Sequence, residues 1–224
     1  MSIHWSKRNH KINSLAQHLG LKQSQVISFD LPAGWTCPCA DICKSQTNRI
    51  TGKITDGENC QFRCYAASIE SYAANVRKAH WSNFDTIKTL STDEIVKVIN
   101  DSIPNDIKII RIHSSGDFFN KAYFNAWVKI ASLNPDITFF GYTKVIQYVN
   151  AVKPDNFKLV YSYGGKMDSK LTNEPTVYVI KDKAEAIGKR LDVVCQENDW
   201  DDFQAIMSGK TFAIVLHGTQ PAKA

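Results

Sequence analysis

The second half of the chain alternates between short apolar runs and amphipathic stretches. The apolar runs are rich in Ile, Val, Phe and Tyr and end in small or polar residues, a pattern typical of buried strands. Six of them follow residue 106, and another precedes the first cysteines. The predicted strands cover residues 26–32, 107–116, 137–143, 157–164, 175–180, 191–195 and 211–218.

Between these runs, apolar residues recur at the spacing of a helix. In residues 120–135, Tyr123, Phe124 and Trp127 fall on one face, and Asn120 can cap the first turn. These three aromatic residues are therefore expected in the core. The other predicted helices cover residues 66–79, 91–101, 145–152, 182–190 and 199–207, with Ser91 (or Thr92) and Asp182 as caps.

Strands that alternate with helices in this way indicate right-handed β–α–β units and a mostly parallel sheet. We expect a single α/β domain over residues 1–224, with a sheet of about seven strands that resembles an incomplete (partial) TIM barrel. Residues 1–25 are expected to form an N-terminal extension, and residues 33–64 a cysteine-rich loop. Ligands bind at the carboxyl ends of parallel strands, so the cysteine loop and the loop after residue 112 should share one edge of the sheet.

Composition and charge narrow the partners and the cellular location expected of the protein. The chain of 224 residues has 43% hydrophobic residues and a formal net charge of +5, which permits an anionic partner such as a nucleotide or nucleic acid without requiring one. No run approaches 18 apolar residues, so no membrane span is expected. The first residues lack the apolar segment of a secretory signal, which favours a cytoplasmic, reducing setting.

Five of the six cysteines fall between residues 37 and 64, at Cys37, Cys39, Cys43, Cys60 and Cys64. In a reducing setting, thiols this crowded favour a metal site or catalysis over disulfides. The spacing is not that of a common zinc ribbon, although zinc stays open. An iron–sulfur cluster tolerates thiolates from a flexible loop. The sixth cysteine, Cys195, lies alone on an apolar strand and is expected to be a buried, inert thiol.

Polar residues at the predicted strand ends are further candidates. His113 and Asp117 flank the small residues Ser115 and Gly116 after one strand, where His113 could serve as a general acid or base and Asp117 could bind a ligand. The alternative for Asp117 is a role in capping the next helix. Lys144 follows another strand and could bind a carboxylate or phosphate, or could simply be exposed. The acidic residues Asp199, Asp201 and Asp202 are explained by a helix N-terminus alone. No HExxH, P-loop or GxSxG motif is present.

The order of these parts resembles the radical S-adenosylmethionine (radical SAM) superfamily, in which a cysteine loop follows the first strand and the next strand ends in a small-small-acidic motif. Here the matching residues are Cys64-Tyr65-Ala66 and Ser115-Gly116-Asp117. Most of the chain is also similar to a phage-encoded family of unassigned function. That similarity rests on SFDLPAGWTCPCADIC, DGENCQFRCYAAS, RIHSSGDFFNKAYFNAWVKIASLNPDITFFGYTK and LHGTQP.

The resemblance implies a 4Fe–4S cluster held by three cysteines, with an open iron that binds the amino and carboxylate groups of S-adenosylmethionine. It further implies that a 5′-deoxyadenosyl radical acts on an unknown substrate, with a nucleotide or nucleic-acid base as one candidate. In that case Ser115, Gly116 and Asp117 would lie against the methionine amino group. Phe62 or Tyr65 would contact adenine, and Ser162 or Tyr163 the ribose.

The implied cluster ligands are Cys37, Cys43 and Cys64, with Cys60 as a close rival and Cys39 as the most expendable. Three ligands leave an iron open for catalysis, whereas four close the cluster and restrict it to electron transfer or structure. The family spacing, C-x3-C-x2-C, is here interrupted by a sixteen-residue insert.

The resemblance also carries expectations about partners and location. A catalytic protein would need an electron donor such as flavodoxin or ferredoxin, and would work in the cytoplasm of a phage-infected host. The competing hypothesis is a non-catalytic phage protein, stabilised by zinc or by a cluster, whose lysines bind nucleic acid.

Overall fold

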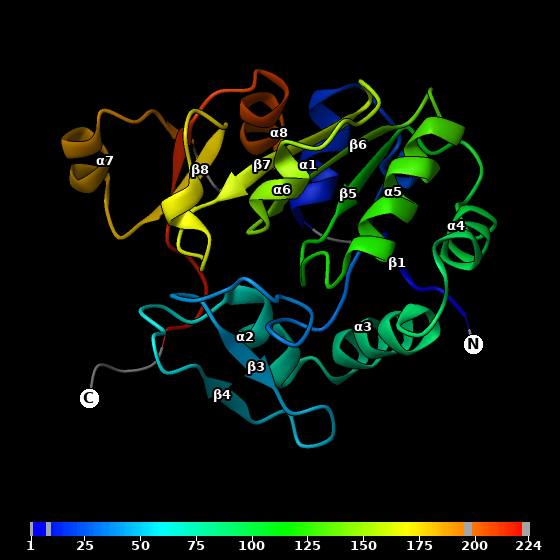
Figure 1. The fold of residues 1–224 in the computed structure, drawn as a ribbon, viewed down its shortest axis with the longest axis horizontal. Coiled ribbons are helices and arrows are strands. Elements are labelled where there is room, and N and C mark those ends of the chain that lie inside the picture. The colour runs from blue at the N-terminus through cyan, green and yellow to red at the C-terminus, as the bar shows by residue number, and fades with distance from the viewer. Residues whose placement is uncertain (1, 8–9, 195–198, 221–224) are drawn as a thin grey trace.

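The computed structural model describes residues 2–7, 10–194 and 199–220 (Figure 1). Within these residues, one sheet contains eight strands in the order β1-β2-β5-β6-β7-β8-β10-β9. Its strands are β1 (Trp5–Ser6), β2 (Val26–Phe29), β5 (Ile109–Ile112), β6 (Thr138–Thr143), β7 (Phe157–Ser162), β8 (Thr176–Ile180), β9 (Val193–Val194) and β10 (Phe212–Val215). Each of the seven predicted strands is present in the sheet.

The sheet is parallel except at one edge, where β1 pairs antiparallel with β2. From β2 to β8 the spatial order follows the chain, as it does in a barrel. The order then reverses, because β10 pairs with β8 and β9 lies outside it. The two edges, β1 and β9, are not paired with each other, so the fold is α/β with a mostly parallel, barrel-like sheet that remains incomplete.

Helices separate the strands along the chain. They are α1 (His10–His18), α2 (Tyr65–Tyr72), α3 (Ala74–Ile87), α4 (Thr92–Asn100), α5 (Lys121–Leu133), α6 (Ile146–Val149), α7 (Lys183–Lys189) and α8 (Asp199–Met207), with 3-10 turns η1 (Gln23–Gln25) and η2 (Asp168–Lys170). The predicted caps are confirmed for α4, α5 and α7, where Ser91, Asn120 and Asp182 each accept a hydrogen bond from a backbone N–H of the first turn.

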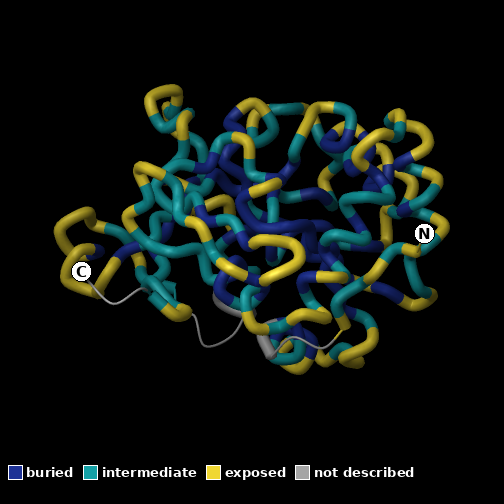
Figure 2. The backbone as a smooth tube through the Cα atoms, turned by 90° about the horizontal axis from the view of Figure 1, so that it is seen from below, coloured by how far each residue is buried: buried dark blue, intermediate teal, exposed yellow. Residues whose placement is uncertain are grey.

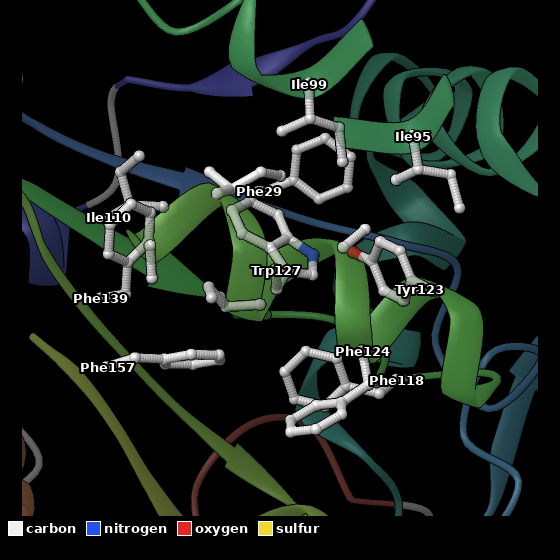
Figure 3. Packing of buried hydrophobic residues seen from close by; sticks show 14 of the residues in the cluster. Phe29, Ile95, Ile99, Ile110, Phe118, Tyr123, Phe124, Trp127, Phe139 and Phe157 are labelled. Atoms are coloured by element: carbon white, nitrogen blue, oxygen red, sulfur yellow. The ribbon is translucent and has the colours of Figure 1, made fainter. Parts of the chain in front are cut away.

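Alternating strand residues divide the core between the two faces of the sheet. Ile110 and Phe139 face one side and pack with α4 and α5, where Tyr123, Phe124 and Trp127 are buried as expected (Figure 3). Their neighbours Ile109 and Phe140 face the other side, which is covered by α1 and α8. Both faces are therefore buried, which explains why the strands read as continuous apolar runs.

The N-terminal residues are part of the fold rather than a separate extension. Within residues 2–7, β1 adds a strand to the sheet, and the indole of Trp5 packs edge-to-face on Phe29 with ring centroids 5.3 Å apart. Ile12 and Leu15 of α1 are fully buried. Neither element was predicted, because a two-residue strand is too short to show an alternating pattern.

The cysteine-rich loop forms a small layer of its own at the carboxyl ends of the strands. It contains a two-stranded antiparallel sheet of β3 (Ser45–Thr47) and β4 (Ile54–Asp56), which packs against α2 (Figure 1). Figure 2 shows the buried segments, in dark blue, at the centre and the exposed segments, in yellow, around them. Among the described residues, no helix is long and apolar enough to cross a membrane.

Candidate functional site

A pocket of about 180 Å³ lies where the cysteine loop meets the carboxyl ends of the parallel strands. Its walls come from the cysteine loop, the start of α2, and the ends of β5, β6, β7, β8 and β10. The predicted site residues that line it are Cys37, Cys43, Phe62, Cys64, Tyr65, His113, Ser115, Gly116, Asp117, Lys144 and Ser162. The structure thus brings predicted residues that are up to 125 positions apart in the sequence (37 to 162) into one site.

Three of the cysteines, Cys37, Cys43 and Cys64, line this pocket and are called the thiol trio below. Each is partly buried and free of a disulfide. Burial raises the pKa of Cys37 well above its usual range, and Asp117, Cys64 and Cys43 raise it further. The three thiols are thus close enough to act on one another electrostatically.

Cys64 occupies the N-cap position of α2. Burial raises the pKa of its thiol to about 12 and nearby Cys43 adds to this, although the backbone N–H groups of Ala67 and Ala66 oppose the shift by hydrogen bonding. A thiol here keeps its proton unless a cation replaces it. The helix N-terminus then supplies donors to the resulting thiolate.

The other two cysteines of the loop do not line the pocket. The Cys60 thiol donates to the carbonyl of Phe62 at 3.2 Å and lies 3.7 Å from the Ser45 hydroxyl. Cys39 holds the β7–β8 loop through its backbone, since its carbonyl accepts from the N–H of Lys166 at 2.9 Å. Cys60, predicted as a rival ligand, therefore lies outside the pocket with its thiol hydrogen-bonded to the protein.

The thiol trio is the group of residues that could hold an iron–sulfur cluster. In residues 2–7, 10–194 and 199–220, no three His, Cys, Asp or Glu side chains are placed to hold one metal ion. A 4Fe–4S cluster has another requirement, because each thiolate binds a different iron and the sulfurs need not converge on one point. Soft thiolate donors on a loop, with burial that favours charge neutralisation, suit such a group.

Asp30, directly after β2, fixes the loop that follows β5. Its Oδ1 accepts from the backbone N–H of Ser114 at 2.7 Å and of Ser115 at 3.2 Å. Its Oδ2 accepts from the hydroxyls of Ser6 and Ser28, both at 2.8 Å. This buried carboxylate therefore ties β1, β2 and the end of β5 together.

Glu70 of α2 is the second organising carboxylate and is fully buried. Its Oε1 accepts from the N–H of Ala33 at 3.0 Å and lies 3.0 Å from the Ser115 hydroxyl and 2.7 Å from Nδ1 of His80. It thereby attaches the helix after the last cysteine to both loops of the pocket. Asp30, Glu70 and also Asp117, whose contacts are given below, all accept hydrogen bonds from the loops around the pocket. We call these three side chains the carboxylate platform.

Gly116 is required by its conformation and its surroundings. Its φ is +90°, and a Cβ atom would lie 2.6 Å from the Thr36 hydroxyl and 2.8 Å from Cβ of Leu31. The neighbouring Ser115 hydroxyl lies 2.8 Å from the Leu31 carbonyl, so the loop is packed directly on the chain after β2. Only glycine allows this close approach.

Asp117 joins the ends of β5 and β6. Its Oδ1 accepts from the N–H of Phe118 at 2.7 Å and from the Thr143 hydroxyl at 2.8 Å, and its Oδ2 accepts from the N–H of Lys144 at 2.9 Å. Burial raises its pKa to about 6 despite these bonds, which favour the charged form. Capping of α5 belongs to Asn120, so the capping alternative for Asp117 was wrong.

Lys144 serves the protein itself. It is buried, and its Nζ donates to the carbonyls of Ser162 and Tyr163 at 2.9 and 2.7 Å and lies 3.1 Å from the Ser162 hydroxyl. Of the two alternatives for Lys144, the exposed one was therefore wrong, and its three N–H donors are directed at protein oxygens. Lys144 positions Ser162 at the pocket, whereas Tyr163 is outside it and packs on Tyr178.

His113 is buried at the end of β5 with a φ of +70°. Its Nε2 lies 2.8 Å from the hydroxyl of Tyr123. Burial lowers the pKa of the imidazole to about 3, although Asp30 opposes this, so the ring is neutral at physiological pH. A neutral ring with so low a pKa suits hydrogen bonding better than general base catalysis.

Several pocket residues escaped the sequence analysis. Arg111 and Asp202 are buried and line the pocket, and His217 stacks on Tyr65 with ring centroids 4.8 Å apart. Arg111 could have been found as the one charge inside the run IIRI. Asp202 lies in the first turn of α8, as predicted, but its burial at the pocket was not foreseen. Cys195 lies outside the described residues.

Comparison with known proteins places the chain among phage proteins. It is 24% identical over 172 residues to the Gene 88 protein of Mycobacterium phage L5 and 23% identical over 172 residues to that of Mycobacterium phage D29. Each match covers 71% of this chain and 62% of the relative, so the chain matches less than two thirds of their length. No solved structure matches. Residues 5–223 match the family described as Gene product 88, and the chain therefore belongs to that family.

Proposed function

We propose that this chain is an iron–sulfur, radical SAM-like enzyme. The observation that carries the proposal is the separation of the five loop cysteines into two groups. Cys37, Cys43 and Cys64 line one pocket, while Cys39 and Cys60 lie outside it. Three thiolates at one site correspond to a 4Fe–4S cluster with one iron left open for S-adenosylmethionine.

The location of the thiol trio supports the proposal. The trio faces the carboxyl ends of parallel strands, where α/β proteins bind their ligands. Bound together, the cluster and S-adenosylmethionine would supply a one-electron cleavage of the sulfonium that starts hydrogen abstraction from a substrate. The residues of the chain hold and shield these groups.

The polar end of the pocket suits an ammonium group. Asp117 is buried there and accepts three hydrogen bonds, and a carboxylate has room for about one more. Its position next to Cys37 places a negative charge beside the trio. We assign the methionine amino group of S-adenosylmethionine to Asp117, with Ser115 and Gly116 shaping the loop.

The rest of the pocket suits an adenosyl group and excludes water. Phe62 and Tyr65 line it beside Cys64, so either ring can contact adenine, and the Ser162 hydroxyl, positioned by Lys144, can reach a ribose. Val177, Val179, Ile214 and Leu216 add an apolar wall. Such walls protect reactive species from water.

The proposal implies two partners. An electron donor such as flavodoxin or ferredoxin must reduce the cluster, and a small molecule or nucleotide serves as substrate. The reducing cytoplasm of an infected host would preserve both the thiols and the cluster.

The test is to purify the protein without oxygen, reduce it, add S-adenosylmethionine and measure 5′-deoxyadenosine. We expect about four irons per chain and cleavage that is lost in Cys64→Ser and kept in the matched control Cys39→Ser. A colourless protein with one zinc per chain would overturn the proposal in favour of a zinc-stabilised, nucleic-acid-binding protein. Iron without cleavage would indicate a closed cluster and would also overturn it.

A further inference from the structure

His113 is held in a strained position at the floor of the pocket. A positive φ costs a non-glycine residue of order 1–3 kcal/mol and persists where the surrounding structure enforces it. Here the enforcement comes from two sides: the N–H of His113 donates to the carbonyl of Phe29 at 3.1 Å, and its ring packs edge-to-face on Phe118 at 4.8 Å. The imidazole is thus fixed rather than free to swing.

The hydrogen bond to Tyr123 decides which ring nitrogen carries the proton. The Tyr123 hydroxyl is fully buried in the core (Figure 3), and Nε2 of His113 is the acceptor within reach, at 2.8 Å. A buried hydroxyl that fails to donate loses a hydrogen bond, so the Tyr123 proton points at Nε2. A neutral imidazole has one N–H, and that N–H is then on Nδ1.

Nδ1 of His113 is buried and has no hydrogen-bond partner in the described residues. His113 lines the pocket whereas Tyr123 does not, so Nδ1 is the ring nitrogen left to serve a ligand. A buried, unpaired N–H is costly to keep, which indicates that its partner arrives from outside.

Ser114 shows the same pattern one residue later. Its N–H donates to Asp30, and its carbonyl accepts from the Tyr65 hydroxyl. Its side-chain Oγ is buried without a partner in the part of the chain that the structure describes, and Ser114 also lines the pocket. The backbone N–H and C=O of Ser114 are therefore both used to hold the residue, and its hydroxyl remains available to a ligand.

We propose that Nδ1–H of His113 and the hydroxyl of Ser114 form a two-donor site for an oxyanion, a carboxylate or a phosphate, carried by the ligand of this pocket. The cations Arg111 and Lys144 line the same pocket and balance Asp117 and Asp202, so an added oxyanion is tolerated. The site requires no metal and therefore stands independently of the iron–sulfur proposal.

The test uses ring-nitrogen NMR on the full chain labelled with ¹⁵N-histidine, with His113→Asn to assign the signal. In the metal-free protein at neutral pH, His113 should carry its proton on Nδ1. Sodium acetate or inorganic phosphate should then shift this signal in a saturable way, with chloride at equal ionic strength as the control. A response to acetate alone identifies a carboxylate ligand, and a response to phosphate alone a phosphate ligand.

Ser114→Ala provides the second variant, because it removes only the hydroxyl and leaves both backbone bonds. We expect it to weaken anion binding by about tenfold, the loss of one hydrogen bond to a charged group. Two results would overturn the site: a proton on Nε2 of His113, or shifts with both anions no larger than those of the exposed His4 ring.

Discussion

The thiol trio lines the pocket and the carboxylate platform holds the loops around it, but the two groups are satisfied in opposite ways. Asp30 accepts four hydrogen bonds from the protein and Asp117 accepts three, so their partners are built into the fold. For the thiols of Cys37 and Cys64, burial and neighbouring acidic groups both raise the pKa. The platform is therefore architecture, while the trio is the part that a cation would neutralise under the proposed function.

The largest loss of stability should follow from removing a carboxylate of the platform. Glu70→Ala removes the acceptor shared by Ala33, His80 and Ser115 and leaves buried donors unpaired. We expect the free energy of unfolding, measured by urea denaturation, to fall by about 3–5 kcal/mol. Glu70→Gln keeps an acceptor oxygen and should cost less; equal, small losses in both variants would show that the platform does not stabilise the fold.

A somewhat smaller loss of stability should follow from adding one methyl group at Gly116, in the loop that the platform holds. In Gly116→Ala, the Cβ atom meets Thr36 and Leu31 at a φ of +90°. The expected loss in the free energy of unfolding is about 2–3 kcal/mol. The matched control is Gly188→Ala in α7, where a Cβ meets nothing within 4 Å. There, stability should stay the same or rise by about 0.5–1 kcal/mol.

The sequence predicted the regular part of this architecture well. Each apolar run became a strand, and Asn120 and Asp182 became helix caps, because periodicity and capping are local signals. It also predicted that the cysteine loop and the loop at Ser115 would share one edge.

The platform was not predictable in this way. Asp30 and Glu70 are 40 residues apart (30 to 70) and meet through Ser115 and His80, so neither has a local pattern that reveals its role. The structural role of Lys144 was not predicted for the same reason, since its acceptors at Ser162 and Tyr163 lie at the end of another strand. The strand reversal at β9 and β10 likewise depends on packing between distant segments.

Lys144→Met tests whether that lysine belongs to the architecture. The change leaves the carbonyls of Ser162 and Tyr163 without their donor, and we expect a loss of about 1–3 kcal/mol in the free energy of unfolding. Lys166→Met, at an exposed position, should stay within about 0.5 kcal/mol of the wild type. Similar values for the two variants would contradict a structural role.

The smallest change in stability should come from the thiol trio itself. Cys43→Ser in metal-free protein should alter the free energy of unfolding by less than about 1 kcal/mol, because the thiol supports no platform contact. A loss as large as that of Glu70→Ala would place Cys43 in the architecture and remove the contrast between the two regions.

The most direct test of the central claim is the iron content and visible spectrum of anaerobically purified Cys64→Ser and Cys60→Ser. These cysteines stand four positions apart (60 and 64), yet only Cys64 lines the pocket. We expect Cys60→Ser to keep about four irons and a brown colour, as the wild type does, and Cys64→Ser to lose both. Equal loss of iron in the two variants would mean a closed, four-cysteine cluster and would contradict an open catalytic iron.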